Sequence, residues 1–142
     1  MMKTSEEAIQ AIKGFEGLRL AAYRCPGGVW TIGYGHTKGV RDGMACTETE
    51  ADRWLREDLE ESERAVTALA VCKGQGQFDA LVDFVFNLGI GSLKRSALLR
   101  CIRRGDTDEE VCRQFRRWVY SGGRKLQGLV KRREWDAKRW TE

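Results

Sequence analysis

Apolar and polar residues follow a helical period over most of the chain. From residue 47 onward, a stripe of positions recurs at steps of three and four: Leu55, Leu59, Ser62, Val66 and Leu69. This spacing is one face of an amphipathic helix. Thr47 with Glu50 forms a capping box directly before the stripe. We therefore expect a long helix that begins near residue 47.

The segment FDALVDFVFNLG, residues 78–89, is apolar on more than one face. Phe84 and Phe86 lie off the stripe that Phe78 and Leu81 begin. A helix that is apolar most of the way round is buried, so this helix should be central. Further helices are expected over 96–104, ending at Gly105, over 108–120 and over about 126–140, with Ser-Gly-Gly at 121–123 as a stop signal.

The N-terminal third changes pattern. Thr4 and Glu7 match a capping box before a helix that ends at Gly14 or Gly17. From residue 18 to 37, the short strand-forming runs LAAY and VWTIGYG are separated by CPGG, a turn signal. This pattern predicts a small antiparallel hairpin or a three-stranded sheet.

These elements predict a mostly helical α+β protein. A chain of 142 residues corresponds to one domain. We expect residues about 15–46 to form a small β lobe and residues about 47–142 to form a helical lobe, on which the N-terminal helix packs. The long helix would join the lobes, and a cleft between two lobes suits an extended substrate.

Composition narrows the class of protein. The apolar fraction is 42% and the charged fraction 32%, as in soluble globular proteins. No window reaches about 18 consecutive apolar residues. The start MMKTSEEAIQ has no apolar h-region, so no signal peptide is expected and the protein should accumulate in the cytoplasm after synthesis.

Cysteine usage argues against disulfides and metals. The five cysteines are widely spaced and form no C-x-x-C pair. An odd count with these spacings is neither a disulfide framework nor a zinc signature. We expect reduced thiols, and neither a metal ion nor an organic cofactor.

Charge is distributed unevenly along the chain. Residues 94–142 carry 15 basic and 7 acidic side chains, a net charge of +8, whereas residues 1–93 carry a net charge of −4. A basic half indicates a polyanionic partner or a solvated face. Nucleic acid and the bacterial cell wall are both candidates.

The first candidate catalytic residue is Glu16. It follows Phe15 at the end of an apolar helix face. A carboxyl group among apolar side chains loses hydration, which disfavours its charged form and suits a general acid. The alternative from local context is an ordinary surface glutamate at a helix end.

Cys25 and Thr31 lie on either side of the predicted turn. A helix end that faces a hairpin can bring them to Glu16. Glycosidases need an acid for the leaving oxygen and an opposing group that handles water or the developing cation. Cys25 and Thr31 could hold such a water by hydrogen bonds.

Four segments of the sequence, including the one that holds these residues, resemble a known enzyme family. The segments GFEGLRLAAY, TIGYGHT, ALVDFVFNLG and GLVKRREWDAKRW, in this order, resemble the phage-type lysozymes of glycoside hydrolase family 24 over residues 9–140. The family pattern is glutamate, eight residues, aspartate or cysteine, five residues, threonine. Glu16, Cys25 and Thr31 match it.

The resemblance implies a lysozyme-like fold and an endolysin. The implied substrate is the β-1,4 bond between N-acetylmuramic acid and N-acetylglucosamine in peptidoglycan. Family members are typically inverting, so Glu16 would be the acid and Cys25 and Thr31 would organise the attacking water. Better-known members carry aspartate at the position of Cys25. The cysteine could act as a thiol, as a thiolate favoured by Arg24, or as a spacer.

Further site residues follow from the same resemblance. His36 would be structural, pairing with a carboxylate and fixing the sheet to the long helix. Of Arg132 and Arg133, one should form a buried salt bridge, assigned to Arg133, and the other should face solvent. Candidates for substrate contact are Trp30, Gly33, Gly35 and Asn87.

Three other functions stay open. Cys25 and His36 could form a cysteine peptidase or amidase. The arginine-rich helices could bind nucleic acid, although no helix-turn-helix, zinc or RNP-like motif accompanies them. The chain could also be an inactive lysozyme homologue, which the intact Glu16 and Thr31 argue against. If the chain is a lysozyme-like enzyme, a transglycosylase that leaves anhydro ends is a further alternative.

The resemblance also implies partners. We expect peptidoglycan as the substrate, no nucleic acid, no stable membrane insertion and a monomer. Synthesis would occur in the host cytoplasm, and a phage holin would give access to the wall, leading to host cell lysis and phage release.

Overall fold

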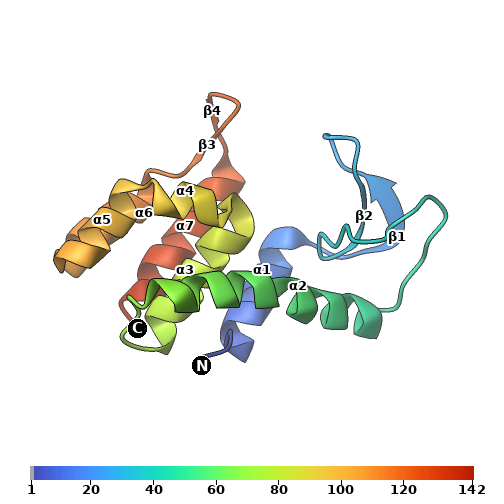
Figure 1. Ribbon diagram of the computed structural model, residues 1–142. Coiled ribbons are helices and arrows are strands. Elements are labelled where there is room, and N and C mark those ends of the chain that lie inside the picture. Colours follow the sequence, from blue (N-terminus) through green and yellow to red (C-terminus); the bar gives the residue numbers. More distant parts are fainter. Residues whose placement is uncertain (1) are drawn as a thin grey trace. The chain divides into compact units, whose positions relative to one another are not determined.

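The computed structural model describes residues 2–142, which form seven helices and four short strands (Figure 1). In chain order they are α1 (Glu6–Glu16), β1 (Arg19–Arg24), β2 (Trp30–Gly33), α2 (Glu48–Leu69), α3 (Gln75–Leu88), α4 (Ile90–Lys94), α5 (Ala97–Arg104), α6 (Asp108–Arg116), β3 (Tyr120–Ser121), β4 (Arg124–Lys125) and α7 (Gln127–Trp140). The mostly helical α+β class is confirmed. The chain divides into two compact units, one of Ile9–Glu61 and one of Ser62–Glu142 with the segment up to Ala8.

In the unit Ile9–Glu61, β1 and β2 form an antiparallel hairpin with Tyr23 opposite Thr31 (Figure 1). The turn is closed by two hydrogen bonds, from Gly28 N–H to the Cys25 carbonyl and from Cys25 N–H to the Val29 carbonyl. Gly28 has a φ of 82°. A turn followed by a left-handed glycine is the three-residue hairpin connection with a G1 bulge. A bridge between Ala21 and Ala45 adds a third short segment to this sheet.

Of the two predicted capping boxes, one is present. For α2, Thr47 N–H donates to Glu50 Oε1 at 3.0 Å, and Glu50 N–H donates to Thr47 Oγ1 at 3.1 Å, which confirms the capping box. For α1, the prediction of Thr4 was wrong by one residue. Ser5 Oγ accepts from Ala8 N–H at 3.1 Å. The Thr4 hydroxyl donates instead to Glu63 at 2.6 Å.

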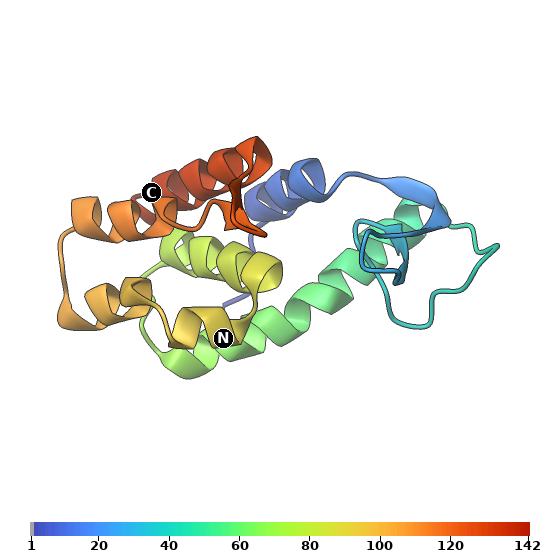
Figure 2. The same cartoon turned by 90° about the horizontal axis from the view of Figure 1, so that it is seen from above.

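The unit containing Ser62–Glu142 is organised around α3. Residues 78–85 of this helix are all buried, which confirms the predicted central helix. α7 runs beside α3 and packs on it, and α6 packs on α7 (Figure 2). Phe84 of α3 makes edge contacts with Phe115 and Trp118. These contacts form the aromatic part of the core.

Two elements of this unit differ from the sequence prediction. The short helix α4 was not predicted. The helix expected over 108–120 ends at Arg116 and is followed by the hairpin β3–β4. Gly122 and Gly123 have φ values of 57° and 78°. Two consecutive left-handed residues make the type I′ turn that joins antiparallel strands, so the glycine pair closes a hairpin rather than only stopping a helix.

Among residues 2–142, the helices are all too short or too polar to cross a lipid bilayer.

Candidate active site

Glu16 is the last residue of α1. The helix ends because Gly17 adopts a left-handed φ of 76° and its N–H bonds to the Lys13 carbonyl at 2.9 Å. The Glu16 side chain is half-buried and lies against Gly35, whose φ is 83°. A Cβ atom at position 35 would be 3.1 Å from Glu16 Oε1. Gly35 therefore leaves room for the carboxyl group.

Cys25 and Thr31 come together across the β1–β2 hairpin. Cys25 is half-buried at the start of the turn, and Thr31 is buried on β2. The Thr31 hydroxyl donates to the Val29 carbonyl at 3.0 Å and is also a hydrogen-bond partner of the Cys25 sulfur. The hairpin thus places a thiol and a hydroxyl within hydrogen-bond reach, as expected from the Cys25–Thr31 spacing.

The turn also acts on the acidity of Cys25. The backbone N–H of Val29 and then that of Gly27 hydrogen-bond the sulfur, and together with the Thr31 hydroxyl they lower the pKa of the Cys25 thiol below its ordinary value. Loss of hydration opposes this shift only in part. Arg24, expected to favour the thiolate, stacks over the Trp30 ring at 5.3 Å instead. The main chain, not Arg24, polarises the thiol.

His36 is held by α2 from two sides. Its Nδ1 lies 2.8 Å from Asp58 Oδ2. Its ring stacks on Trp54 with centroids 4.8 Å apart and planes at 11°. Trp54 and Asp58 are one helical turn apart, so they present to the same side of α2. These two contacts hold the His36 ring against α2.

Gly33 packs against α2, and the ring of Trp30 lies beneath the Arg24 side chain. A Cβ atom at Gly33 would lie 3.1 Å from the Cβ of Ala51 on α2. Close packing of the hairpin on the helix therefore requires a residue without a side chain at position 33. Trp30 is half-buried, with the Arg24 guanidinium above its ring.

Asn87 and Arg133 belong to the other unit. Asn87 is near the end of α3, and its Oδ1 accepts from Arg133 Nη2 at 2.9 Å. Arg133 is fully buried. The expectation that one of the arginine pair faces solvent was wrong: Arg132 is also buried and donates to Asp83 Oδ1 at 2.8 Å. Both arginines face α3 because the buried Asp83 needs positive partners.

The buried charges of α3 and α7 form a network. Arg133 Nε lies 2.9 Å from Asp136 Oδ2, and Arg133 Nη2 lies 3.6 Å from Asp83 Oδ2. Complete burial, with the nearby Asp83 carboxylate, holds the pKa of Asp136 well above its usual range. Asp83 and Asp136 were not identified from the sequence. For Asp83, the available signal was its place among the apolar residues of α3.

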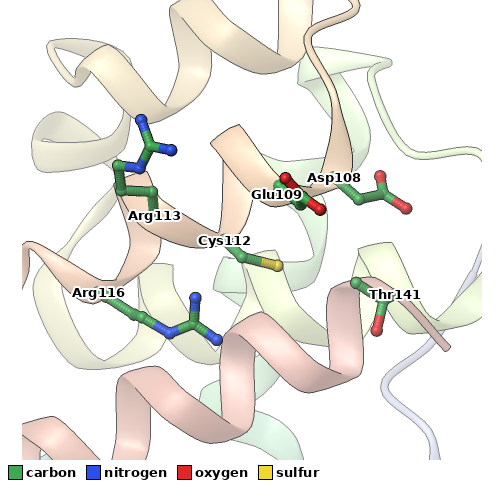
Figure 3. Close-up of a pocket in the computed structure, with 6 residues that line it drawn as sticks. All are labelled: Asp108, Glu109, Cys112, Arg113, Arg116 and Thr141. Carbon is green, nitrogen blue, oxygen red and sulfur yellow. The ribbon is translucent and has the colours of Figure 1, made fainter.

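A pocket of about 400 Å³ opens in the unit containing α6 and α7 (Figure 3). The Cys112 sulfur points into it, with Asp108 and Glu109 on one side and Arg113 and Arg116 on the other (Figure 3). Burial raises the pKa of the Cys112 thiol. No residue predicted for the site lines this pocket. Among residues 2–142, no three His, Cys, Asp or Glu side chains are grouped so as to hold a metal ion.

Comparison with known proteins agrees with this arrangement. The family described as phage lysozyme matches residues 13–136. The chain belongs to the phage lysozyme family. This match includes Glu16, Cys25 and Thr31, and it confirms the resemblance to this family.

The related sequences are named endolysins. An endolysin of Bacillus phage B103 is 42% identical over 94% of this chain, and the chain spans 52% of that relative's length. An endolysin of Acyrthosiphon pisum secondary endosymbiont phage 1 is 38% identical over 94% of both sequences. A SAR-endolysin of bacteriophage PS119 is 40% identical over 85% of this chain and 73% of its own.

Solved structures show the same fold. The muramidase domain of SpmX from Asticaccaulis excentricus superposes with a TM-score of 0.92 at 37% identity, covering 100% of this chain and 99% of that one. The crystal structure of a P22 lysozyme point mutant superposes with a TM-score of 0.88 at 31% identity over 100% of both chains. The lysozyme-like fold is thereby confirmed.

Proposed function

We propose that this chain is a muramidase endolysin that hydrolyses the β-1,4 bond between N-acetylmuramic acid and N-acetylglucosamine in peptidoglycan. The observation that carries the proposal is the hairpin pair of Cys25 and Thr31, in the same unit as a Glu16 carboxyl group seated against Gly35. The proposal includes that residues 1–142 act as a single lysozyme-like domain.

In this mechanism Glu16 is the general acid. It would deliver a proton to the glycosidic oxygen as the C1–O bond breaks. Gly35 leaves room for Glu16 Oε1, since a Cβ at position 35 would lie 3.1 Å from this atom. Because Gly35 has no side chain, the backbone there can come close to a sugar.

Cys25 and Thr31 would hold the attacking water. The Thr31 hydroxyl has one hydrogen, which it can donate either to the Val29 carbonyl or to the Cys25 sulfur, and its oxygen can accept a hydrogen bond from a water molecule. The lowered pKa of Cys25 favours a thiolate that can take the proton given up by that water. The water oxygen would then bond to C1 as the leaving sugar departs, an inverting displacement.

Further substrate contacts are proposed for Trp30, Gly35 and Asn87. The Trp30 ring, with Arg24 stacked above it, would offer a face to a sugar ring. Gly33 would act indirectly, by letting the hairpin pack on α2. The basic half of the chain would strengthen attraction to anionic wall polymers.

The competing cysteine peptidase is less well supported. It requires a histidine that is available to Cys25 as a base. His36 is buried, pairs with Asp58 at 2.8 Å and stacks on Trp54. A histidine held in this way supports a structural role.

An endolysin acts on the cell wall, and we propose a holin as its route there and a monomer as its form. Relatives named SAR-endolysins raise the alternative of export without a holin. Expression with and without a holin distinguishes the two routes: lysis that needs no holin would contradict the proposed one.

Digestion of purified peptidoglycan by the wild type and by Glu16→Gln tests the activity, with products identified by mass spectrometry. We expect reducing muramic ends from the wild type and a loss of roughly 10²–10⁴-fold in turnover in the variant, because an amide cannot donate the proton. Glu57→Gln, on the exposed side of α2, is the matched control and should keep full turnover.

Other products would contradict the proposal in distinct ways. Anhydro ends would indicate a transglycosylase. New amino groups without glycan cleavage would favour Cys25 and His36 as an amidase pair. Unchanged turnover in the Glu16→Gln variant would show that Glu16 is not the proton donor.

A further inference from the structure

Lys13 lies in the last turn of α1, three residues before Glu16. Its backbone carbonyl accepts the Gly17 N–H at 2.9 Å, in the bond that closes the end of the helix. Its side chain is only 17% exposed, although lysine side chains are mostly exposed in folded proteins. Residues three apart on a helix are neighbours on its surface. The contacts that hold Lys13 therefore act on the same turn of α1 that carries Glu16.

The ammonium group of Lys13 is paired with α2. Its Nζ lies 2.6 Å from Asp52 Oδ1. Asp52 also accepts from Arg56 Nε at 2.9 Å. Hydrogen bonds from Arg56 and then from Lys13 lower the pKa of Asp52, so this carboxylate stays ionised at neutral pH. The pair with Arg56 stays within α2, whereas the pair with Lys13 joins the end of α1 to α2.

The same ammonium group contacts the segment that follows β2. Lys13 Nζ lies 5.4 Å from the centre of the buried Tyr34 ring. A cation over an aromatic ring is attracted to it, more strongly where water is excluded. The next residue is Gly35, where a Cβ atom would be 3.1 Å from Glu16 Oε1. Lys13 thus contacts the residue adjacent to the glycine that faces the Glu16 carboxyl group.

These contacts connect the end of α1, α2 and the Tyr34–Gly35 segment, all within the unit Ile9–Glu61. We propose that Lys13 is a positioning residue for glycan hydrolysis, which keeps the end of α1, and with it Glu16, beside Gly35 through its contacts with Asp52 and Tyr34. This role rests on the proposed function, in which Glu16 is the general acid. Lys13 itself does not act on the reacting atoms.

The variant Lys13→Met tests this role by its turnover on peptidoglycan. Methionine keeps an unbranched side chain but carries no charge for Asp52 or Tyr34. We expect kcat to fall about tenfold with KM changed less than about twofold, because a displacement of a catalytic group by about 1 Å can cost 10²-fold in rate. Lys13→Arg keeps a cation for both partners and should recover most of the lost kcat.

Arg56→Met is the matched control. It removes the other cation from Asp52 but leaves the link between α1 and α2 in place. It should therefore keep the kcat of the wild type. Equal losses of kcat in Lys13→Met and Arg56→Met would overturn the proposal. A Lys13→Met variant that loses thermal stability but keeps its kcat would also overturn it.

Combining Lys13→Met with Glu16→Gln shows whether Lys13 acts through Glu16. Residues that act on one step give non-additive effects in a double-mutant cycle. We expect the double variant to be as slow as Glu16→Gln alone. A further tenfold loss would assign the effect of Lys13 to something other than Glu16 and overturn the proposal.

The failure of this proposal and the failure of the proposed function give different results. Turnover that is unchanged in Glu16→Gln would contradict the proposed function, and the role of Lys13 with it. A slow Glu16→Gln variant beside a fully active Lys13→Met variant would contradict only the role of Lys13. Amide hydrogen exchange tests the link without any activity: the Gly17 N–H should exchange faster in Lys13→Met than in Arg56→Met, because the end of α1 opens more often. Equal exchange rates would overturn the proposal.

Discussion

The two units of the molecule use carboxyl groups in opposite ways. In the unit Ile9–Glu61, Glu16 is half-buried at a helix end, next to a glycine. In the other unit, Asp83 and Asp136 are fully buried between α3 and α7 and are matched by arginines. Gly35 leaves room for the Glu16 carboxyl group because it has no side chain, whereas Asp83 and Asp136 are paired with opposite charges.

The two kinds of carboxyl group should contribute to different properties, one to catalysis and the other to the stability of the fold. Removing one partner of a buried ion pair strongly destabilises a protein. A carboxylate that is buried in such a pair does not reach a substrate. Glu16 is only half-buried, so its substitution does not leave a fully buried charge without a partner. Substitutions in the two units should therefore affect different measured quantities.

The largest effect on stability is expected from Asp83→Asn. It removes the carboxylate that pairs with buried Arg132 and Arg133, which should reduce the free energy of unfolding by roughly 3–5 kcal/mol. Part of the loss should be recovered at neutral pH, since Asp83 no longer raises the pKa of Asp136 and that carboxylate can ionise. Urea unfolding measures the change.

Glu134→Gln is the matched control for Asp83→Asn. It breaks the ion pair with Arg116, in which both side chains are about half exposed, at 50% and 53%. Such surface pairs contribute about 0–1 kcal/mol. Equal losses in the two variants would contradict the distinction between buried and exposed charge.

A smaller effect, on both quantities, is expected from Gly35→Ala. An alanine at a φ of 83° costs about 1–2 kcal/mol. Its Cβ would also press on Glu16 Oε1 at 3.1 Å, and displacing a catalytic group by about 1 Å can cost 10²-fold in rate. Turnover on peptidoglycan and thermal unfolding measure the two parts.

Gly43→Ala has the same backbone cost without the contact. Its φ is 85°, and no atom lies within 4 Å of the position of its Cβ. It should lose stability as Gly35→Ala does but keep its turnover. If both variants lost turnover equally, the Glu16 contact would have no role.

The smallest expected effect is a difference in the reactivity of two thiols, Cys25 in one unit and Cys72 in the other. Backbone N–H groups lower the pKa of Cys25, whereas burial raises the pKa of Cys72 to about 11. Iodoacetamide reacts with the thiolate. Peptide mapping over a pH series should therefore show Cys25 alkylated at lower pH than Cys72. The reverse order would show that the turn does not polarise the sulfur.

The sequence predicted the parts of the fold that depend on local pattern. The stripe from Leu55 to Val66 and the capping box of Thr47 and Glu50 became α2, because helical period and caps act within one turn. The β3–β4 hairpin was missed because its strands have two residues each, too few for an alternating pattern. Gly122 and Gly123 are equally typical of a helix stop.

The candidate site, like the fold, could be predicted from the sequence only in its local features. The spacing of Glu16, Cys25 and Thr31 was readable along the chain, and the family match covers all three. Three-dimensional partners were not readable. That Asp58 would meet His36, or that Arg132 would be buried like Arg133, depends on which faces of distant helices meet. Sequence spacing alone does not contain that information.

The turn that closes the β1–β2 hairpin has a consequence for the evolution of the enzyme. The donors that polarise position 25 are the main-chain N–H groups of Val29 and Gly27, which stay in place whatever side chain they face. A carboxylate at this position would meet the same donors. An exchange of cysteine for aspartate at position 25 would therefore keep the main-chain donors that this turn supplies.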